Sequence, residues 1–148
     1  MSGYTLVTGG AGFIGAHAVV RLLEGGLRPL VLDNFSNSKE SVIERIKKVT
    51  RMQVEVEKVN ILDKARIDSV FDSRKIDSVM HFAGLKAVGE SAICPIDYYK
   101  NNVEGTITLL DCMLRHGVNN LIFSSSATVY SEGDPPFAEE LAISRPIS

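Results

Sequence analysis

Residues 5–15 read TLVTGGAGFIG, an apolar run that meets a cluster of glycines and continues into helix-like sequence. The pattern predicts a strand, a tight turn and the start of a helix. Gly10, Gly12 and Gly15 match the motif G-x-G-x-x-G, and Gly9 with the last two matches a G-x-x-G-x-x-G variant. Such glycines let a pyrophosphate approach the backbone, at a helix N-terminus that favours anions. The stretch therefore predicts a dinucleotide site, with a plain glycine turn as the alternative.

An acidic residue at the right distance supports the nucleotide interpretation. The short apolar run 30–32 predicts a second strand, which ends at Asp33, 18 residues after Gly15. In dinucleotide-binding folds the acid that binds the adenosine ribose follows the glycines by about 20 residues. A carboxylate there accepts hydrogen bonds from the ribose hydroxyls and repels a 2′-phosphate. The spacing favours NAD over NADP, against the alternative of an acidic residue that merely ends a strand.

Helices are expected between the strands, from apolar residues at intervals of three and four. In the first, Ile14, Ala18 and Leu22 form a row with Val19 and Leu23 beside it, and Gly25-Gly26 ends the helix. In the second, Asn37 and Glu40 resemble a capping box, Val42, Ile46 and Val49 form the apolar row, and Glu44 faces Lys48. Asp63 is expected to cap a third helix that carries Ile67, Val70 and Phe71. Residues 95–116 predict one long helix that ends at Gly117, with Gly105 packed closely on the sheet.

The remaining strands complete a parallel α/β sheet. Residues 54–57 alternate between apolar and charged, as an edge strand does, whereas 79–84 and 121–123 are apolar and buried in character. His81 lies within the fourth strand, where a packed, hydrogen-bonded histidine is favoured over a catalytic one. We expect a Rossmann-like doubly wound sheet with the strand order 3-2-1-4-5, formed by a single NAD-binding domain over residues 1–148.

Composition restricts the classes of partner. The chain has 148 residues and a formal net charge of -2, so electrostatics gives no reason to expect nucleic acid or an anionic membrane surface. Neither Cys94 nor Cys112 has C-x-x-C spacing or a neighbouring ligand cluster, so two reduced thiols are expected and no metal site. A leader segment or a long apolar run is not evident. The expected location is the cytoplasm.

Taken together, these motifs resemble those of the UDP-glucose 4-epimerases, a family of the extended short-chain dehydrogenase/reductase superfamily. The glycine motif and Asp33 point to the superfamily, whereas the runs 81–91 and 124–130 are specific to the 4-epimerases. The resemblance rests on residues 8–15, Asp33, Asn34, Asn37, Ser38, 81–91, Tyr98, Tyr99, 101–103 and 124–130.

The resemblance implies an NAD site and a UDP-sugar site. The residues implied for NAD are Gly9, Gly12, Phe13, Ile14 and Gly15 at the pyrophosphate; Asp33, Asn34, Asn37 and Ser38 at the adenosine; Asn60 and Ile61 at the adenine; and Phe82, Ala83, Gly84, Lys86 and Asn101 along the rest. Those implied for the substrate are Lys86, Ser126, Ala127 and Thr128, with Ser126 as the catalytic residue that hydrogen-bonds the reacting hydroxyl. The reaction implied is epimerisation at C4 of a UDP-hexose through a transient 4-keto sugar, a step of galactose metabolism.

The chain departs from the family pattern in the residue that acts as the catalytic base. The family's base is the tyrosine of a Y-x-x-x-K motif, and no tyrosine here has a lysine four residues on. By the family's spacing this motif would begin just beyond Ser148, as would the remaining strands and the substrate domain. Asn60 replaces a usual aspartate, and Ser131 replaces a usual glycine. We therefore expect residues 1–148 to be catalytically inactive alone. The resemblance also implies a homodimer for the full-length protein, because members of the family are usually homodimers.

Two other functions remain open. One is a catalytically inactive NAD-binding fragment, which the continuation of the reading frame past Ser148 would distinguish from an epimerase. The other is a related dehydratase or reductase, which is disfavoured. A dehydratase should have an acidic residue near Thr128, and an NADPH-dependent reductase should have a basic residue in place of Asp33; the sequence shows neither.

Overall fold

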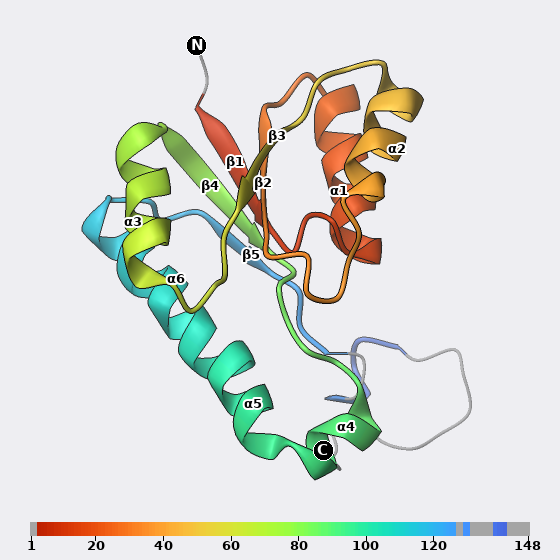
Figure 1. Cartoon of the computed structure of the whole chain (residues 1–148), viewed down its shortest axis with the longest axis vertical. Helices are drawn as coiled ribbons and strands as arrows, with labels where there is room; N and C mark the ends of the chain where they lie inside the picture. Colours follow the sequence, from red (N-terminus) through yellow and green to blue (C-terminus); the bar gives the residue numbers. More distant parts are fainter. Residues whose placement is uncertain (1–2, 127–128, 131–137, 142–148) are drawn as a thin grey trace.

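The computed structural model describes residues 3–126, 129–130 and 138–141, and in these residues a parallel sheet lies between two layers of helices (Figure 1). The elements are β1 (Tyr4–Thr8), α1 (Phe13–Glu24), β2 (Pro29–Asp33), α2 (Ser41–Thr50), β3 (Glu55–Lys58), α3 (Lys64–Ser73), β4 (Ile76–His81), α4 (Val88–Ile93), α5 (Pro95–Tyr99), the π-helical segment η1 (Lys100–Glu104), α6 (Gly105–Arg115) and β5 (Leu121–Phe123). The strand order is β3-β2-β1-β4-β5, and every pairing is parallel. The predicted Rossmann-like, doubly wound fold is confirmed.

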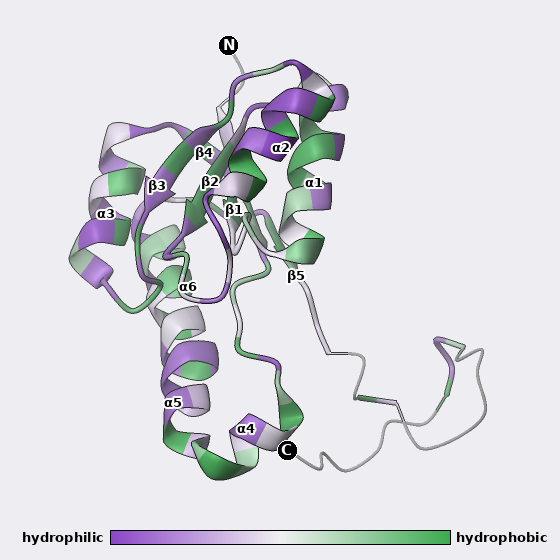
Figure 2. Ribbon diagram, turned by 45° about the vertical axis from the view of Figure 1, so that its right-hand side comes forward, coloured by the Kyte–Doolittle hydropathy of each residue, from purple (hydrophilic) through white to green (hydrophobic). Residues whose placement is uncertain are grey.

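The sheet is apolar on both faces because helices cover both. Successive residues of β1 point to opposite faces, so that Leu6 packs in a cluster with α3 and α6, whereas Val7 packs in a second cluster with α1 and α2. Leu30 and Val31 of β2 divide in the same way. In Figure 2 helices α2 and α3 change from green to purple around their circumference, as amphipathic helices on a sheet do. The unalternating runs of the central strands are explained by this double coverage.

The chain reverses its direction of winding between β1 and β4, and this creates the crevice of the fold. From β1 the chain moves by way of α1 to β2 on one side, whereas β4 joins β1 on the other. In such sheets the loops at the carboxyl ends separate at this switch point and leave room for a ligand. Helices α4 and α5 extend beyond the same edge of the sheet (Figure 1).

Helix α1 buries only one of the apolar rows that its sequence carries. Its buried residues are Gly15, Val19 and Leu23, whereas Ile14 is 57% exposed. The adjoining row with Val19 and Leu23 thus faces the sheet, and the row that begins at Ile14 lies beside it. Gly15 belongs to the buried row, and its lack of a side chain allows α1 to lie close to the glycine turn.

Helix α2 differs from expectation at its start and on its surface. Its N-cap is Glu40 and no side chain caps it, so the predicted capping box at Asn37 is wrong. Ile43 and Ile46 are buried, but Val49 is 69% exposed. Glu44 pairs with Lys47 at 2.9 Å, a spacing of three residues, in place of the expected pair with Lys48.

Helix α3 and the end of α6 agree with prediction. The Asp63 side chain accepts a hydrogen bond from the Arg66 N–H at 3.1 Å and so caps α3, whose buried residues are Ile67, Val70 and Phe71. Gly117 follows α6 with a φ of +68°, a left-handed conformation that suits glycine and ends the helix.

The predicted helix 95–116 is divided into α5, η1 and α6, and α4 precedes it without having been predicted. A Cβ on Gly105 would lie 2.6 Å from the Cγ2 atom of Ile61. The close contact at Gly105 is thus with the loop after β3 and not, as expected, with the sheet. Within the described ranges no helix is long and apolar enough to span a membrane.

Candidate functional site

A cavity of about 370 Å³ lies at the carboxyl edge of the sheet, at the switch point. It is bounded by the loops that follow β1, β2, β3, β4 and β5 and by one turn of η1. Its lining residues are Gly9, Gly12, Phe13, Ile14, Gly15, Leu32, Asp33, Asn34, Ser36, Asn37, Ser38, Val59, Ile61, Phe82, Ala83, Gly84, Leu85, Lys86, Asn101 and Ser124.

The glycine turn after β1 forms one wall of this cavity. Gly9 has a φ of +67°, and a Cβ there would lie 2.6 Å from the backbone N of Ala83. Gly12 donates its N–H to the Gly9 carbonyl at 3.0 Å. A Cβ on Gly15 would lie 2.2 Å from that same carbonyl oxygen. These three glycines follow the G-x-x-G-x-x-G variant, and Gly10 is not among the lining residues.

The N-terminus of α1 opens into the cavity without a side chain in front of it. Gly12 is the N-cap and makes no side-chain cap, and the first turn carries no acidic residue. The backbone hydrogen bond from the Ala16 N–H to the Gly12 carbonyl, 2.9 Å long, begins the helix. The N–H groups of the first turn therefore point out of the helix end, where they favour an anion.

Asp33 joins the glycine turn to the loop after β2. Its side chain is 8% exposed, and Oδ2 accepts a hydrogen bond from the Ala11 N–H at 2.9 Å. Oδ1 accepts from the Phe35 N–H at 2.9 Å and from the Ser38 hydroxyl at 3.0 Å. Since a carboxylate has about four acceptor positions, the three bonds leave it capacity for a ligand hydroxyl.

The opposite wall is fixed by an asparagine of η1. Asn102 accepts from the Leu85 N–H and donates to the Leu85 carbonyl, both at 2.8 Å. Its neighbour Asn101 donates to Asn102 Oδ1 at 2.9 Å and lines the cavity. A π-helical turn contains an extra residue compared with an α-helical one, and such turns are frequent at functional sites. Here the extra residue brings two successive asparagines to the segment after β4.

His81 links the two walls from inside the core, where it is 2% exposed. The Thr106 hydroxyl donates to the Asn102 carbonyl at 2.6 Å, so His81 Nε2, 2.9 Å away, is the donor to Thr106. Nδ1 then accepts from the Thr8 hydroxyl at 2.6 Å. Burial lowers the pKa of His81, which favours this neutral form. The hydrogen-bonded core histidine that we expected is confirmed.

A second, larger hollow of about 600 Å³ continues from the first. The two share Ile14, Ser124 and residues 82–86. Ser126 lies in its lining with Ser125, after β5. The implied substrate residues Ala127 and Thr128 lie outside the described residues. A ligand that extends from the first cavity past Lys86 would therefore reach Ser126.

The implied cofactor residues lie together around the first cavity, with the exception of Asn60. That residue is exposed, and its Oδ1 accepts a hydrogen bond from the Leu62 N–H at 3.0 Å. Sequence reasoning missed five lining residues, which are Leu32, Ser36, Val59, Leu85 and Ser124. Leu32, Ser36, Val59 and Leu85 are direct neighbours of implied residues, and Ser124 begins the run 124–130 on which the resemblance rests, so adjacency was a usable signal.

The glycine turn, the uncapped start of α1 and the acid that ends β2 fit a dinucleotide, because the glycines allow the turn and α1 to lie close together and the first-turn N–H groups then face the cavity that a pyrophosphate would enter. The fold and site thus define a dinucleotide-binding protein of the Rossmann class. Residues 5–148 match the model of the NAD dependent epimerase/dehydratase family, and the chain belongs to that family.

Curated relatives are similar over most of the chain. It is 53% identical over 133 residues to a UDP-glucose 4-epimerase of Yersinia pestis, which covers 90% of this chain and 39% of the relative. It is 49% identical over 142 residues to a UDP-glucose 4-epimerase of Dictyostelium discoideum, with 94% and 41% covered. The chain therefore spans about two fifths of the length of these relatives.

Solved structures of epimerases share the fold. The UDP-glucose 4-epimerase of Bifidobacterium longum in complex with NAD+ and UDP has a TM-score of 0.89 and 44% identity, with 95% of this chain and 42% of that chain covered. The enzyme of Stenotrophomonas maltophila with bound NAD and formylated UDP-arabinopyranose also has a TM-score of 0.89, at 42% identity, with 97% and 43% covered.

Proposed function

We propose that residues 1–148 are the NAD-binding domain of an enzyme that epimerises C4 of a UDP-hexose and interconverts UDP-glucose and UDP-galactose. The observation that carries the proposal is the cavity at the switch point, where the glycine turn and Asp33 meet the segment after β4. The similarity to UDP-glucose 4-epimerases supports the substrate class. Galactose metabolism is the setting that this reaction implies.

Each wall of the cavity has a proposed task. The first-turn N–H groups of α1 hold the pyrophosphate, and Asp33 accepts hydrogen bonds from the adenosine ribose. Asn34, Asn37 and Ser38 contact the adenosine, with Ile61 beside the adenine. Phe82, Ala83, Gly84 and Asn101 line the rest of the bound cofactor. Among the described lining residues Lys86 is the cationic one, and it lies where the two hollows meet.

Bound NAD+ would supply the transient hydride acceptor. The chain's contribution to the chemistry is position and proton handling: Ser126 is proposed to hydrogen-bond the sugar hydroxyl that loses its proton, and Lys86 to hold substrate phosphate or ribose. Ala127 and Thr128 are proposed to lie on the substrate side.

A proton acceptor is the part that residues 1–148 do not provide. Their tyrosines are Tyr4, Tyr98, Tyr99 and Tyr130, and none begins a Y-x-x-x-K motif. We therefore expect this polypeptide to bind NAD without epimerase turnover. The alternative function is that of an inactive NAD-binding module.

Two measurements test the proposal. Calorimetric titration of residues 1–148 should show NAD+ binding at least tenfold tighter than NADP+ binding, because Asp33 opposes a 2′-phosphate; equal binding of both, or of neither, would contradict the proposed site. A chimera that joins residues 1–148 to the remainder of the Yersinia pestis relative should interconvert UDP-glucose and UDP-galactose. Ser126→Ala in the chimera should lower kcat while NAD+ affinity is retained. A chimera that binds NAD+ without turnover would favour the inactive module.

We also propose that the complete enzyme is a homodimer. Large apolar side chains follow one another along α5, η1 and α6 at intervals of three and four, and each is more than a third exposed. This exposed apolar stripe consists of Ile96, Tyr99, Val103, Ile107, Leu110 and Leu114. Such spacing is typical of helices that pack against other helices. A second copy of the same stripe is the partner we propose.

A cytoplasmic location completes the proposal. Cys94 is an exposed free thiol and Cys112 a buried one. Reduced thiols are the rule in the cytoplasm, where the nucleotide-sugar substrate would also be found.

A further inference from the structure

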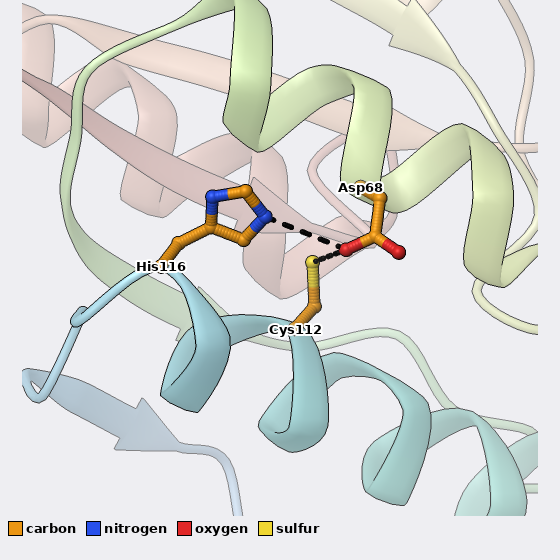
Figure 3. Close-up of side chains that lie close together, drawn as sticks. All are labelled: Asp68, Cys112 and His116. Atoms are coloured by element: carbon orange, nitrogen blue, oxygen red, sulfur yellow. Dashed lines mark hydrogen bonds and ion pairs between the residues drawn. The ribbon is translucent and has the colours of Figure 1, made fainter.

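Three side chains with metal-binding atoms meet on the outer side of the sheet, between α3 and α6 (Figure 3). Asp68 comes from α3 and Cys112 from α6, and His116 is the residue that caps the C-terminus of α6. The Cys112 Sγ lies 3.0 Å from Asp68 Oδ1, and His116 Nε2 lies 3.4 Å from the same oxygen. All the ligand atoms lie within 4.8 Å of one another. None of the three residues lines either hollow.

We propose that Asp68, Cys112 and His116 bind a divalent cation of the zinc class, with water as the fourth ligand. Thiolate, imidazole and carboxylate are the ligands that zinc selects. Their bond lengths of about 2.0–2.3 Å place neighbouring ligand atoms roughly 3.3–3.8 Å apart in a tetrahedron. The observed separations of 3.0 and 3.4 Å need only small side-chain movements to reach these values.

The orientation of His116 suits a metal ligand. Its Nε2 faces Asp68, and its Nδ1 lies 3.9 Å from an Asp72 carboxylate oxygen on the solvent side. Metal-bound histidines commonly turn their other nitrogen toward a carboxylate, which fixes the tautomer. The ring also contacts Phe71, with 5.4 Å between the ring centroids. The imidazole is thus held with its ligating nitrogen toward the other two groups.

Two occupants of the metal-free cluster must be displaced. The Arg115 guanidinium lies 2.6 Å from Asp68 Oδ1, and the Cys112 thiol donates its proton to that oxygen. Arg115 already lies 3.3 Å from Asp111, so it keeps an ionic partner when it leaves Asp68. The thiol proton passes to solvent as the sulfur–metal bond forms. The two anionic ligands then balance the charge of the cation.

A cation bound by Asp68, Cys112 and His116 would have a structural role. Cys112 is fully buried, among Ile67, Val70 and Phe71 of the same core cluster. The side chains of Asp68 and His116 are each 23% exposed, so a cation can approach from their side. A bound ion would join α3 to α6 and should raise the thermal stability of the fold.

Cobalt(II) is the probe, because tetrahedral thiolate coordination gives it an intense visible spectrum and a near-ultraviolet charge-transfer band. The reduced chain, stripped of metal by a chelator, should bind one equivalent with these bands, and zinc(II) should displace the cobalt and raise the Tm. Cys112→Ser should abolish the charge-transfer band. His116→Ala and Asp68→Asn each remove a direct ligand, so they should weaken binding by more than the roughly 10- to 100-fold loss that follows removal of a group that only orients a ligand.

Two further variants separate a metal site from a purely structural contact. Arg115→Gln removes the competing guanidinium and keeps all three ligands, so it should lower the Tm of the metal-free chain and yet tighten cobalt binding. Cys94→Ser removes the exposed thiol as the matched control and should change neither. Circular dichroism establishes that each variant is folded. Absence of the charge-transfer band in the wild type, its persistence in Cys112→Ser, or weaker binding by Arg115→Gln would overturn the proposal.

Discussion

The carboxylate of Asp33 accepts a 2.9 Å hydrogen bond from the backbone N–H of Ala11, and thereby ties the end of β2 to the glycine turn after β1. Asp33 thus shapes the site in addition to its proposed contact with ribose. Asp33→Asn would turn a donor toward at least one of the groups that now donate to it. We expect NAD+ affinity to fall about 10- to 100-fold and the free energy of unfolding to fall by about 1–3 kcal/mol. Calorimetry and urea denaturation measure the two effects, with Asp97→Asn, at an exposed carboxylate of α5 that lines neither hollow, as the control. Unchanged stability in Asp33→Asn would show that the turn does not depend on this carboxylate.

His81 should make the fold sensitive to acid. Burial lowers its pKa below the ordinary value of 6.5. Between the two values the unfolded chain binds the proton and the folded chain does not, so stability is complete above about pH 6.5 and falls as the pH falls. The slope approaches at most about 1.4 kcal/mol per pH unit. His81→Gln should remove this slope in denaturation measured from pH 7 to 5. An identical slope in the variant would assign the effect to another group.

Gly15 should tolerate no side chain. In Gly15→Ala the added Cβ would lie 2.2 Å from the Gly9 carbonyl oxygen, so α1 must move away from the turn. We expect a loss of about 1–3 kcal/mol in stability, as for other overpacked sites, together with weaker NAD+ binding. Gly89→Ala is the matched control, because a Cβ there meets nothing within 4 Å. Equal behaviour of the two variants in thermal denaturation would argue against the close contact.

Asn102 should hold the segment after β4 in place. Asn102→Ala removes both 2.8 Å hydrogen bonds to Leu85 and leaves its backbone groups without that partner. We expect a stability loss of about 1–3 kcal/mol and faster amide hydrogen exchange at Leu85. Asn119→Ala, at an exposed asparagine after α6, is the control. Unaltered exchange at Leu85 would contradict the proposed clamp.

The exposed apolar stripe should govern association. Ile107 is 60% exposed, and Ile107→Glu places a charge in the middle of the stripe. Because burial of an unpaired charge is costly, the variant should be monomeric in sedimentation at concentrations where the parent chain is a dimer. Lys48→Glu, at an exposed position of α2, controls for a change of charge alone. A monomeric parent, or a dimeric Ile107→Glu, would contradict the homodimer.

Local patterns predicted the sheet because the information in its strands is local. The apolar runs before Asp33 and at His81 needed only their own residues to be recognised. Which apolar row α1 buries was left open by the sequence, because it depends on the packing of Gly15 against the Gly9 carbonyl, which is a tertiary contact. The prediction that Asn37 caps α2 was wrong. Asn37 is of a residue type that often caps helices, but the helix begins after Glu40.

The functional residues also divide into those that local sequence patterns predict and those that only tertiary packing brings together. Motif spacing was sufficient to bring Gly9 and Asp33 to one cavity. In contrast, we expected no ligand cluster near Cys112. His116 lies one helical turn from it, but Asp68 is 44 residues away in sequence and joins them only when α3 packs on α6. The α4 helix was missed for a related reason, since it buries no residue and so has no apolar row to reveal it.

The π-helical turn at η1 affects both the lining of the first cavity and the exposed apolar stripe. The π-helical turn contains one residue more than an α-helical turn, and this extra residue sets the rotation of α5 relative to α6 about the common helix axis. Deleting a single residue from Lys100–Glu104 would turn α5 by about 100° relative to α6. Ile96 and Tyr99 would then leave the line of Ile107, and Asn101 and Asn102 would lose their shared position against the segment after β4. The lining of the cavity and the line of the exposed apolar stripe therefore depend on the same extra residue, and its deletion would disturb both.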